Sequence, residues 1–225
     1  MTAHLKIDFV SDVSCPWCAI GLNALERALE RLCREIEADM HFQPFELNPQ
    51  MGRGGQNVIE HLAEKYGSTP EQLERSQEMI TARGAAVGFT FDMGRRTRIY
   101  NTFDAHRLLH WAGEPGTQPA GKQGALKHAL FTAYFTKNRD PSDPDVLVEV
   151  ASKVGLDAGR ARQILASDEY AKDVRARERF YAEHGIHAVP AIIVNDKHLI
   201  QGGQPAEVFE QVLRQLATEP RAVAS

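Results

Sequence analysis

Polar and apolar side chains alternate at the start of the chain, where Leu5, Ile7 and Phe9 occupy one face of a short extended segment. Lys6 and Asp8 occupy the other face, and this period of two is typical of a strand that is buried on one side. The next segment has apolar residues spaced by four and three, which predicts an amphipathic helix. Its apolar stripe consists of Cys18, Leu22, Leu25, Leu29, Leu32 and Ile36.

A second extended segment, residues 39–46, follows this helix, and Pro44 restricts it to the edge of a sheet or the end of a strand. Strand, helix and strand form a βαβ unit, whose right-handed crossover makes the two strands parallel neighbours. Residues 47–55 contain many turn-forming residues and predict a loop.

From residue 56 to about residue 185 the pattern is mostly helical, apart from a short extended piece at residues 89–92. Asp143 and Asp157 stand where N-caps are expected. The predicted helices are residues 58–66, 70–87, 102–112, 122–136, 144–154, 158–166 and 169–184. An all-helical block of this length between β-rich ends predicts an inserted helical domain.

The β pattern returns late in the chain, where residues 191–194 and 198–201 predict a hairpin and residues 205–216 a final helix. The apolar residues of that helix, expected to face inward, are Val208, Phe209, Val212, Leu213 and Leu216. We therefore expect residues 1–54 and 185–225 to form two parts of one α/β domain, with residues 55–184 as the helical insertion.

Composition narrows the class of protein. The chain has 225 residues, of which 43% are hydrophobic and 25% charged, as in an ordinary soluble globular protein. A formal charge of −4 argues against nucleic acid or an anionic membrane as the main partner. No apolar run approaches the ~18 residues of a membrane span, and residues 1–4 show no leader pattern. We therefore expect a cytoplasmic protein, in a reducing compartment where paired thiols are catalytic and structural disulfides are rare.

The sequence S-D-V-S-C-P-W-C places Cys15 and Cys18 where the first strand gives way to the first helix. Pro16 suits the first helical position, because its missing N–H costs nothing there. A thiol at that point faces unpaired backbone N–H groups and the positive end of the helix dipole, which favour the thiolate. Two thiols on one helical turn can close a disulfide, so the motif predicts a redox dithiol.

The apolar stripe of the first predicted helix indicates different roles for the two thiols. Cys18 lies on the buried face, whereas Cys15 is expected to be accessible; Cys15 therefore attacks and Cys18 resolves the mixed disulfide. The alternative is half of a zinc site, but structural zinc needs about four ligands. The remaining cysteine, Cys33, lies far along the same helix and is expected to be a buried, inert thiol. No bound metal is expected.

Further motifs are similar to a known family. D-V-S-C-P-W-C is followed by I-G, and the other matching segments are F-E-L-N-P (45–49), K-Y-G (65–67), N-T-F-D-A-H-R-L (101–108), L-F-T-A-Y-F (130–135) and G-I-H-A-V-P (185–190). In this order they resemble DsbA-like thiol–disulfide oxidoreductases, and specifically their cytoplasmic FrnE-type branch. The chain departs from the family at Ala19, a position that is often aromatic, and this difference matters little. It also departs at Ala191-Ile192, where bulkier aromatic residues are frequent, so a wider groove floor is expected.

The resemblance implies an α/β thioredoxin fold, a four-stranded mixed sheet with a large inserted α-helical domain. It also implies that Pro190 is cis and packs against the dithiol, although trans is the default for an X–Pro bond. The N–H and C=O of Val189 would then pair with an extended substrate. Pro16 and Trp17 are further candidate substrate contacts, although Trp17 could equally serve simple packing.

Several other residues are weaker candidates. Asp12 is a candidate proton relay to Cys18, or else a solvated loop acid or helix cap. Asn101 and His106 fall in a family-like segment and could line the groove. His106 and His110 have the spacing of a metal pair, but without a third ligand polar lining is favoured. Residues 95, 96 and 98 are arginines, interpreted as a solvated loop, with contact to glutathione or an acidic substrate as the alternative.

The sequence thus predicts a thiol–disulfide oxidoreductase or isomerase acting on protein or small-molecule thiols and disulfides. Its redox group would be the Cys15–Cys18 disulfide itself, with no other cofactor and with glutathione as a candidate co-substrate. A monomer or weak homodimer is expected. The alternatives are a glutathione-dependent isomerase or transferase of the same fold, which typically lacks the second cysteine, and a chaperone module that uses the groove without turnover.

Overall fold

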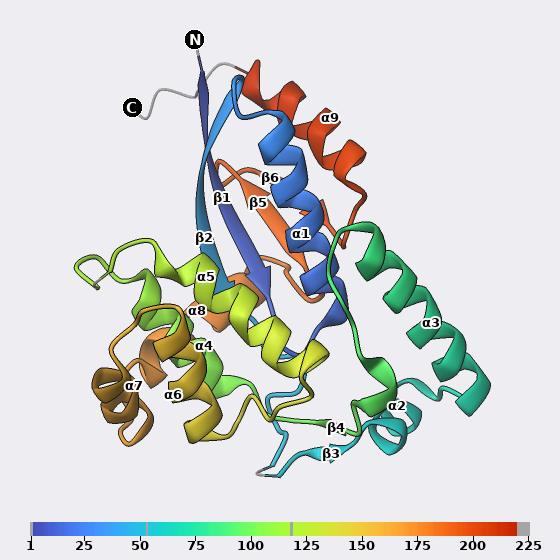
Figure 1. The fold of residues 1–225 in the computed structure, drawn as a ribbon. Coiled ribbons are helices and arrows are strands. Elements are labelled where there is room, and N and C mark those ends of the chain that lie inside the picture. Colours follow the sequence, from blue (N-terminus) through green and yellow to red (C-terminus); the bar gives the residue numbers. More distant parts are fainter. Residues whose placement is uncertain (1, 53, 118, 220–225) are drawn as a thin grey trace.

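The computed structural model describes residues 2–52, 54–117 and 119–219 and contains a four-stranded mixed sheet in the order β2-β1-β5-β6 (Figure 1). The strands are β1 (Ala3–Ser11), β2 (Ile36–Pro44), β5 (Ala191–Val194) and β6 (His198–Gln201). Strand β1 pairs in parallel with β2 and antiparallel with β5, which pairs antiparallel with β6. The expected α/β fold with a large helical insertion is confirmed.

Helix α1 (Pro16–Arg31) connects β1 to β2, which forms an edge of the sheet and ends at Pro44 as expected. The helix is shorter than its apolar pattern indicates. The carbonyl of Leu32 accepts the backbone N–H groups of Glu35 and Ile36, each at 2.8 Å, and this turn reverses the chain. Ile36, which we assigned to the helical stripe, is therefore the first residue of β2.

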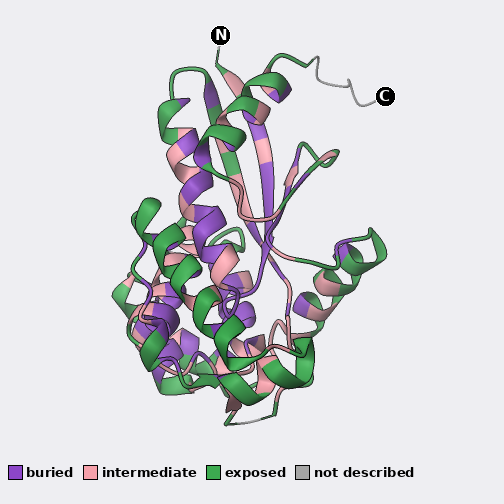
Figure 2. Cartoon of the chain, turned by 90° about the vertical axis from the view of Figure 1, so that its right-hand side faces the viewer, coloured by how far each residue is buried: buried purple, intermediate pink, exposed green. Residues whose placement is uncertain are grey.

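Helices cover both faces of the sheet. Leu5, Ile7 and Phe9 of β1 are buried in a core that includes α1 and α9 (Ala206–Ala217). On the opposite face, Val10 packs in a smaller core with Tyr181 of α8 (Ala171–Glu183) and with Ile186, which follows that helix. Figure 2 shows the central strands as largely buried, while the helices keep exposed outer faces.

The insertion follows the predicted helical pattern closely. Its helices are α2 (Val58–Tyr66), α3 (Pro70–Ala86), α4 (Phe103–Gly113), α5 (Lys122–Phe131), α6 (Pro144–Lys153), α7 (Ala158–Leu165) and α8. Asp143 and Asp157 cap α6 and α7 through their side chains, as expected. Among the described residues no helix is long and apolar enough to cross a membrane.

The irregular parts of the insertion were not predicted. A two-residue pair of strands, β3 (Gln56–Asn57) and β4 (Arg98–Ile99), joins the start of the insertion to the segment before α4, whereas residues 89–92 form no strand. Helix α5 continues as a π-helix over Thr132–Thr136. Tyr134 and Phe135 in this π-helix belong to the same core as the sheet, so the insertion and the sheet are packed together.

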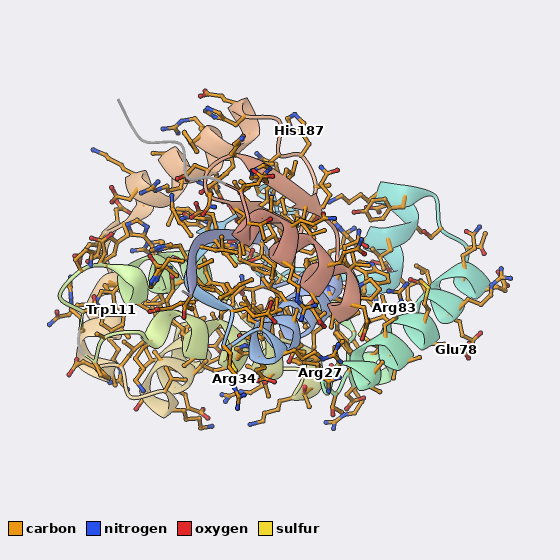
Figure 3. The ribbon with its side chains drawn as sticks, turned by 90° about the horizontal axis from the view of Figure 1, so that it is seen from above. Arg27, Arg34, Glu78, Arg83, Trp111 and His187 are labelled. Carbon is orange, nitrogen blue, oxygen red and sulfur yellow. The ribbon has the colours of Figure 1, made fainter. Side chains whose placement is uncertain are left out.

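A second core lies among α4, α5, α6 and α7 and contains Trp111. Seen from above, Trp111 and Arg83 of α3 lie on opposite sides of the molecule (Figure 3). The helical insertion therefore reaches both sides of the molecule in this view. The boundaries 54/55 and 184/185 remain a prediction.

The hairpin of β5 and β6 has the predicted bounds. Asn195 and Asp196 in its turn both have positive φ, 53° and 57°, which Asn and Asp tolerate better than most residues. In α9, Phe209 and Leu213 are buried as expected, but Val208 is 38% exposed. That prediction was wrong because the inferred stripe was too wide: Val208 lies on the outer flank of the helix.

Candidate functional site

The dithiol occupies the first turn of α1. Cys15 is the N-cap, with extended backbone angles (φ −92°, ψ 113°), and Pro16 is the first helical residue. The Cys15 carbonyl accepts the backbone N–H of Cys18 at 3.1 Å, so the two free thiols stand one turn apart. The helix thus begins where the sequence predicted.

Cys15 and Cys18 differ in their access to solvent. Cys18 is fully buried, whereas Cys15 lines a groove of about 530 Å³. Cys15 itself is only 4% exposed, so it lies at the floor of that groove and not on an open surface, which corrects our expectation of a freely accessible thiol. Burial raises the pKa of the Cys18 thiol, and the adjacent Cys15 raises it further.

The loop before β5 closes the groove beside Cys15. The Val189–Pro190 peptide bond is cis, as the resemblance implied. The Sγ of Cys15 lies 3.7 Å from the Val189 carbonyl oxygen, within reach of a weak S–H···O hydrogen bond. Pro190 also packs against α1: a Cβ added to Gly21 would lie 3.1 Å from its Cγ. The backbone of the Val189–Pro190 loop and the start of α1 therefore meet beside the Cys15 sulfur.

Asp12 is a buried carboxylate. Its Oδ1 accepts the N–H of Ser14 at 3.0 Å, its Oδ2 accepts the N–H of Leu47 at 2.6 Å, and Oδ1 lies 3.7 Å from Nε2 of His106. Burial opposes ionisation, but these contacts outweigh it and lower the pKa of Asp12 to about 2. Asp12 is thus not a solvated loop acid, because its side chain is completely buried and accepts two backbone N–H groups.

Lys127 of α5 was missed by the sequence analysis. It is 1% exposed, and burial lowers the pKa of Lys127 to about 8, against the opposing effect of Cys18, Asp12 and Cys15. Its ammonium lies 5.0 Å from the centre of the Phe131 ring. The signal was present, because Lys127 is spaced four and seven residues from Phe131 and Tyr134 and therefore shares their apolar helix face.

Asn101 and His106 do not line the groove that contains Cys15. The Asn101 amide donates to Glu46 and to the Met51 carbonyl, both at 3.3 Å, and holds the loop before α4. His106 is 2% exposed and shares a small cavity with Lys127. His110 pairs instead with Glu114 at 3.2 Å, and no group of three metal-ligating side chains occurs among the described residues.

The three arginines of the basic run lie in different surroundings. Arg95 is exposed and lies 3.6 Å from Asp92, and Arg98 donates to the carbonyls of Gly54 and Gly55. Arg96 alone lines the groove and is 8% exposed. The solvated-loop interpretation therefore fits Arg95 but not Arg96.

The wall of the groove carries cationic and neutral side chains. Trp17 lines it and also packs against the main core, so both of its proposed uses are compatible with its position. The Arg83 guanidinium lies 5.7 Å from the centre of the Trp17 ring. The polar and charged lining residues that the structure describes are Ser14, Asn48, His61, Lys65, Tyr66, Ser68, Gln72, Ser76, Arg96 and His187.

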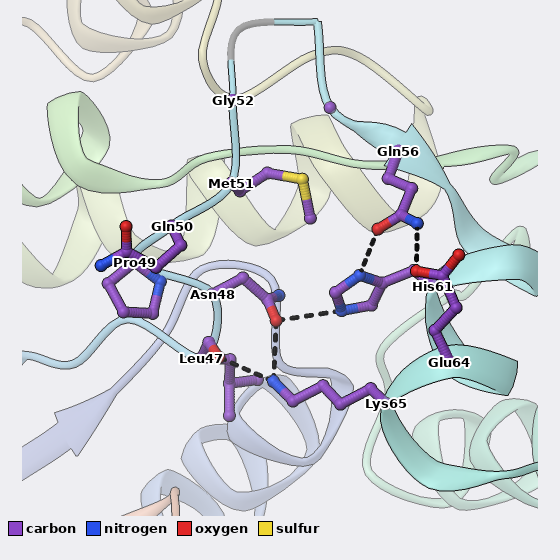
Figure 4. Close-up of a pocket in the computed structure, with 11 residues that line it drawn as sticks. Leu47, Asn48, Pro49, Gln50, Met51, Gly52, Gln56, His61, Glu64 and Lys65 are labelled. Atoms are coloured by element: carbon purple, nitrogen blue, oxygen red, sulfur yellow. Dashed lines mark hydrogen bonds between the residues drawn. The ribbon is translucent and has the colours of Figure 1, made fainter.

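An adjoining cavity of about 660 Å³ shares part of this wall (Figure 4). The Lys65 ammonium donates to the Leu47 carbonyl and to Oδ1 of Asn48, both at 2.7 Å. The same Oδ1 lies 3.0 Å from Nε2 of His61, and Nδ1 of His61 lies 2.7 Å from Gln56. Neutral acceptors therefore hold Lys65 between the two cavities.

Cys33 is exposed, contrary to our expectation of a buried thiol. Helix α1 ends at Arg31, so Cys33 lies in the turn that precedes β2 and not on the buried flank of a longer helix.

Known proteins resemble this chain over nearly its full length. The chain is 28% identical over 215 residues to YwbO, an uncharacterized protein of Bacillus subtilis, and the match covers 95% of this chain and 96% of that protein. A crystal structure of a probable DsbA oxidoreductase from Streptomyces coelicolor is similar with a TM-score of 0.87 and 34% identity, over 99% of this chain and 94% of that one. The cytosolic disulfide reductase DsbM from Pseudomonas aeruginosa, crystallised with GSH, shares the fold at 16% identity, with a TM-score of 0.62 over 94% of this chain and 98% of that one.

Residues 6–214 match the DSBA-like thioredoxin domain, which spans the sheet, the dithiol and the insertion. The chain therefore belongs to the family of DSBA-like thioredoxin domains.

Proposed function

We propose that the protein is a thiol–disulfide oxidoreductase or isomerase of the cytoplasm, on the FrnE-type branch of its family, with Cys15 as the attacking thiolate. The position of Cys15 is the observation that carries this proposal. It caps α1 at the floor of a groove, with Cys18 buried behind it and the Val189 carbonyl 3.7 Å from its sulfur. A thiol so placed meets a substrate sulfur on one side and a resolving thiol on the other.

The reaction consists of two exchanges. The Cys15 thiolate attacks one sulfur of a substrate disulfide, forming a mixed disulfide and releasing the first substrate thiolate. The Cys18 thiolate then attacks the Cys15 sulfur and releases the second. The substrate gains two electrons and the protein ends with a Cys15–Cys18 disulfide. In the opposite direction this disulfide oxidises a substrate dithiol. We expect Pro16, Trp17 and Val189, which line the groove, to border the substrate, and Pro190 to support them from its place against Gly21.

The second exchange requires Cys18 to lose its proton in a buried place. Burial raises the pKa of Cys18 and so opposes this step. Lys127, whose pKa burial lowers to about 8, is the buried group best able to accept that proton near neutral pH. Asp12, with a pKa of about 2, stays ionised. We therefore assign the relay to Lys127 and an electrostatic role to Asp12.

Trapping with Cys18→Ala tests the proposal. This variant can form the mixed disulfide but cannot resolve it, so substrates should remain linked to Cys15 and be identified by mass spectrometry. The matched Cys15→Ala variant should capture none. If Cys15→Ala keeps its affinity for clients and the wild type exchanges no disulfide, the protein is a binding module. If Cys18→Ala keeps full turnover with glutathione, a glutathione-dependent isomerase or transferase replaces our proposal.

A further inference from the structure

The groove around Cys15 is more positive than the protein as a whole. The chain carries a formal charge of −4. Among the described residues that line the groove, however, Lys65 and Arg96 are cations and none is Asp or Glu. The volume of about 530 Å³ is in the usual range of small-molecule sites. Any selectivity for charge therefore favours a small anion over a cation.

Arg96 is the least satisfied of these cations. It is 8% exposed, and its guanidinium lies 5.7 Å from the centres of both the Tyr134 and the Phe135 rings. Its Nε has no hydrogen-bond partner, and none of the ion pairs within the described residues includes Arg96. Arg96 does interact with the Tyr134 side chain, but no carboxylate neutralises its charge, and a buried charge without an ionic partner is costly. The two rings lie beside the guanidinium, and a guanidinium can receive a carboxylate in two-point contact.

Lys65 supplies a second positive charge, which also forms no ion pair among the described residues. Its hydrogen-bond partners, the Leu47 carbonyl and the Asn48 side chain, are neutral. Burial lowers the pKa of Lys65, although the charge of Asp12 acts in the opposite direction. The groove is therefore lined by two cations from two separate elements, α2 and the segment before β4, and neither forms an ion pair with a carboxylate among the described residues.

We propose that the groove binds a small disulfide or thiol that carries carboxylate groups, with Arg96 as the residue that pairs with a carboxylate. This inference rests on the proposed function. An acidic disulfide held in this way gives a Cys15–substrate mixed disulfide and one free acidic thiolate. Attack by Cys18 then releases the second thiolate and leaves the Cys15–Cys18 disulfide. The reduced dithiol supplies both electrons.

Single-turnover kinetics of the reduced protein tests the inference. The probes are dithiodipropionate, which is a dianion, hydroxyethyl disulfide, which is neutral, and cystamine, which is a dication. Each rate constant is divided by that of a small free thiol with the same disulfide, which removes differences in leaving group. We expect this normalised rate to be highest for dithiodipropionate. Arg96→Gln should lower it about tenfold more for dithiodipropionate than for hydroxyethyl disulfide, as for loss of a charge-assisted hydrogen bond.

Arg95→Gln is the matched control, because Arg95 is exposed and next in sequence. It should leave all three rates unchanged, and Arg96→Lys should keep part of the preference. An equal effect of Arg96→Gln on all three probes would overturn the inference. Should Arg96→Gln not fold, the wild type alone decides: absence of any normalised preference for the dianion also overturns it. Failure of the proposed function looks different, since no disulfide would then react.

Discussion

Gly21 of α1 and Gly203, which follows β6, approach each other so closely that neither has room for a side chain. A Cβ on Gly21 would lie 3.2 Å from Cα of Gly203, and a Cβ on Gly203 would lie 2.9 Å from the Trp17 carbonyl oxygen. This contact holds the first turns of α1 against the segment after β6, in which the Gly202 N–H donates to the Pro190 carbonyl at 2.8 Å. It thereby fixes the distance between the dithiol and the opposite wall of the groove.

Gly203→Ala should therefore destabilise the protein. The new methyl group meets backbone, which cannot move aside as a flexible side chain can, so we expect a loss of about 1–3 kcal/mol in the free energy of unfolding. Urea denaturation measures this loss. Gly94→Ala is the control, because nothing lies within 4 Å of a Cβ at that position. Equal stability of the two variants would contradict the close contact.

The Lys127 assignment predicts a defect in one step only. Lys127→Met should slow the resolution of the mixed disulfide about a hundredfold at pH 7, the lower range for loss of a general base. In the wild type this step should accelerate as the pH rises toward about 8, where Lys127 loses its proton. Acid quench and mass spectrometry follow the mixed disulfide directly.

Lys127→Arg is the control for charge. It keeps a cation at the site but cannot accept a proton, so it should resemble Lys127→Met if proton transfer matters. A normal resolution rate in Lys127→Arg would instead assign Lys127 an electrostatic role.

Asp12 should make stability depend on acidity. Its pKa falls from 3.8 to about 2 on folding, so its ionised form stabilises the folded state by about 2 kcal/mol above pH 4. This contribution is present above the unfolded pKa and is lost as the pH falls toward 2. The difference in stability between wild type and Asp12→Asn should therefore be constant above pH 4 and shrink below it. Urea titrations at several pH values measure it, and a constant difference down to pH 2 would be the contrary result.

The exposed Cys33 predicts a side reaction. Under oxidising conditions the wild type should form a disulfide-linked dimer on a non-reducing gel, and Cys33→Ser should abolish it. Stability should change by no more than about 0.5 kcal/mol, as for an ordinary surface substitution. In Cys33→Ser, iodoacetamide should modify Cys15 while buried Cys18 stays protected until the protein unfolds. Modification of Cys18 before Cys15 would reverse the assigned roles.

Local patterns in the sequence were sufficient for most elements and for the dithiol. The bounds of β5, β6 and α2 agree with the predicted ranges because turns and caps mark both their ends. The same patterns do not indicate which side chain faces which across the fold. Arg95 and Arg96 are neighbours in sequence, yet one is solvated and the other lies in the groove.

Lys127 illustrates the second limit. A lysine on an apolar helix face is usually read as a flank residue whose ammonium reaches water. The packing of α5 against α4, α6 and β2 shows that this side chain stays buried. Cys33 was misplaced for a related reason, since the helical period continued past the true end of α1.

The central strand β1 also has a consequence during translation. Its partner β2 ends at residue 44, but its other partner β5 begins only at residue 191. At ~5–20 residues per second, the ribosome needs roughly 7–30 s to make the intervening segment. All three cysteines lie in the part already made. For that interval a nascent chain carries Cys15 and Cys18 without the strand and loop that later cover them, beside a Cys33 that stays exposed. A wrong disulfide within residues 15–33 therefore has its best chance before synthesis is complete.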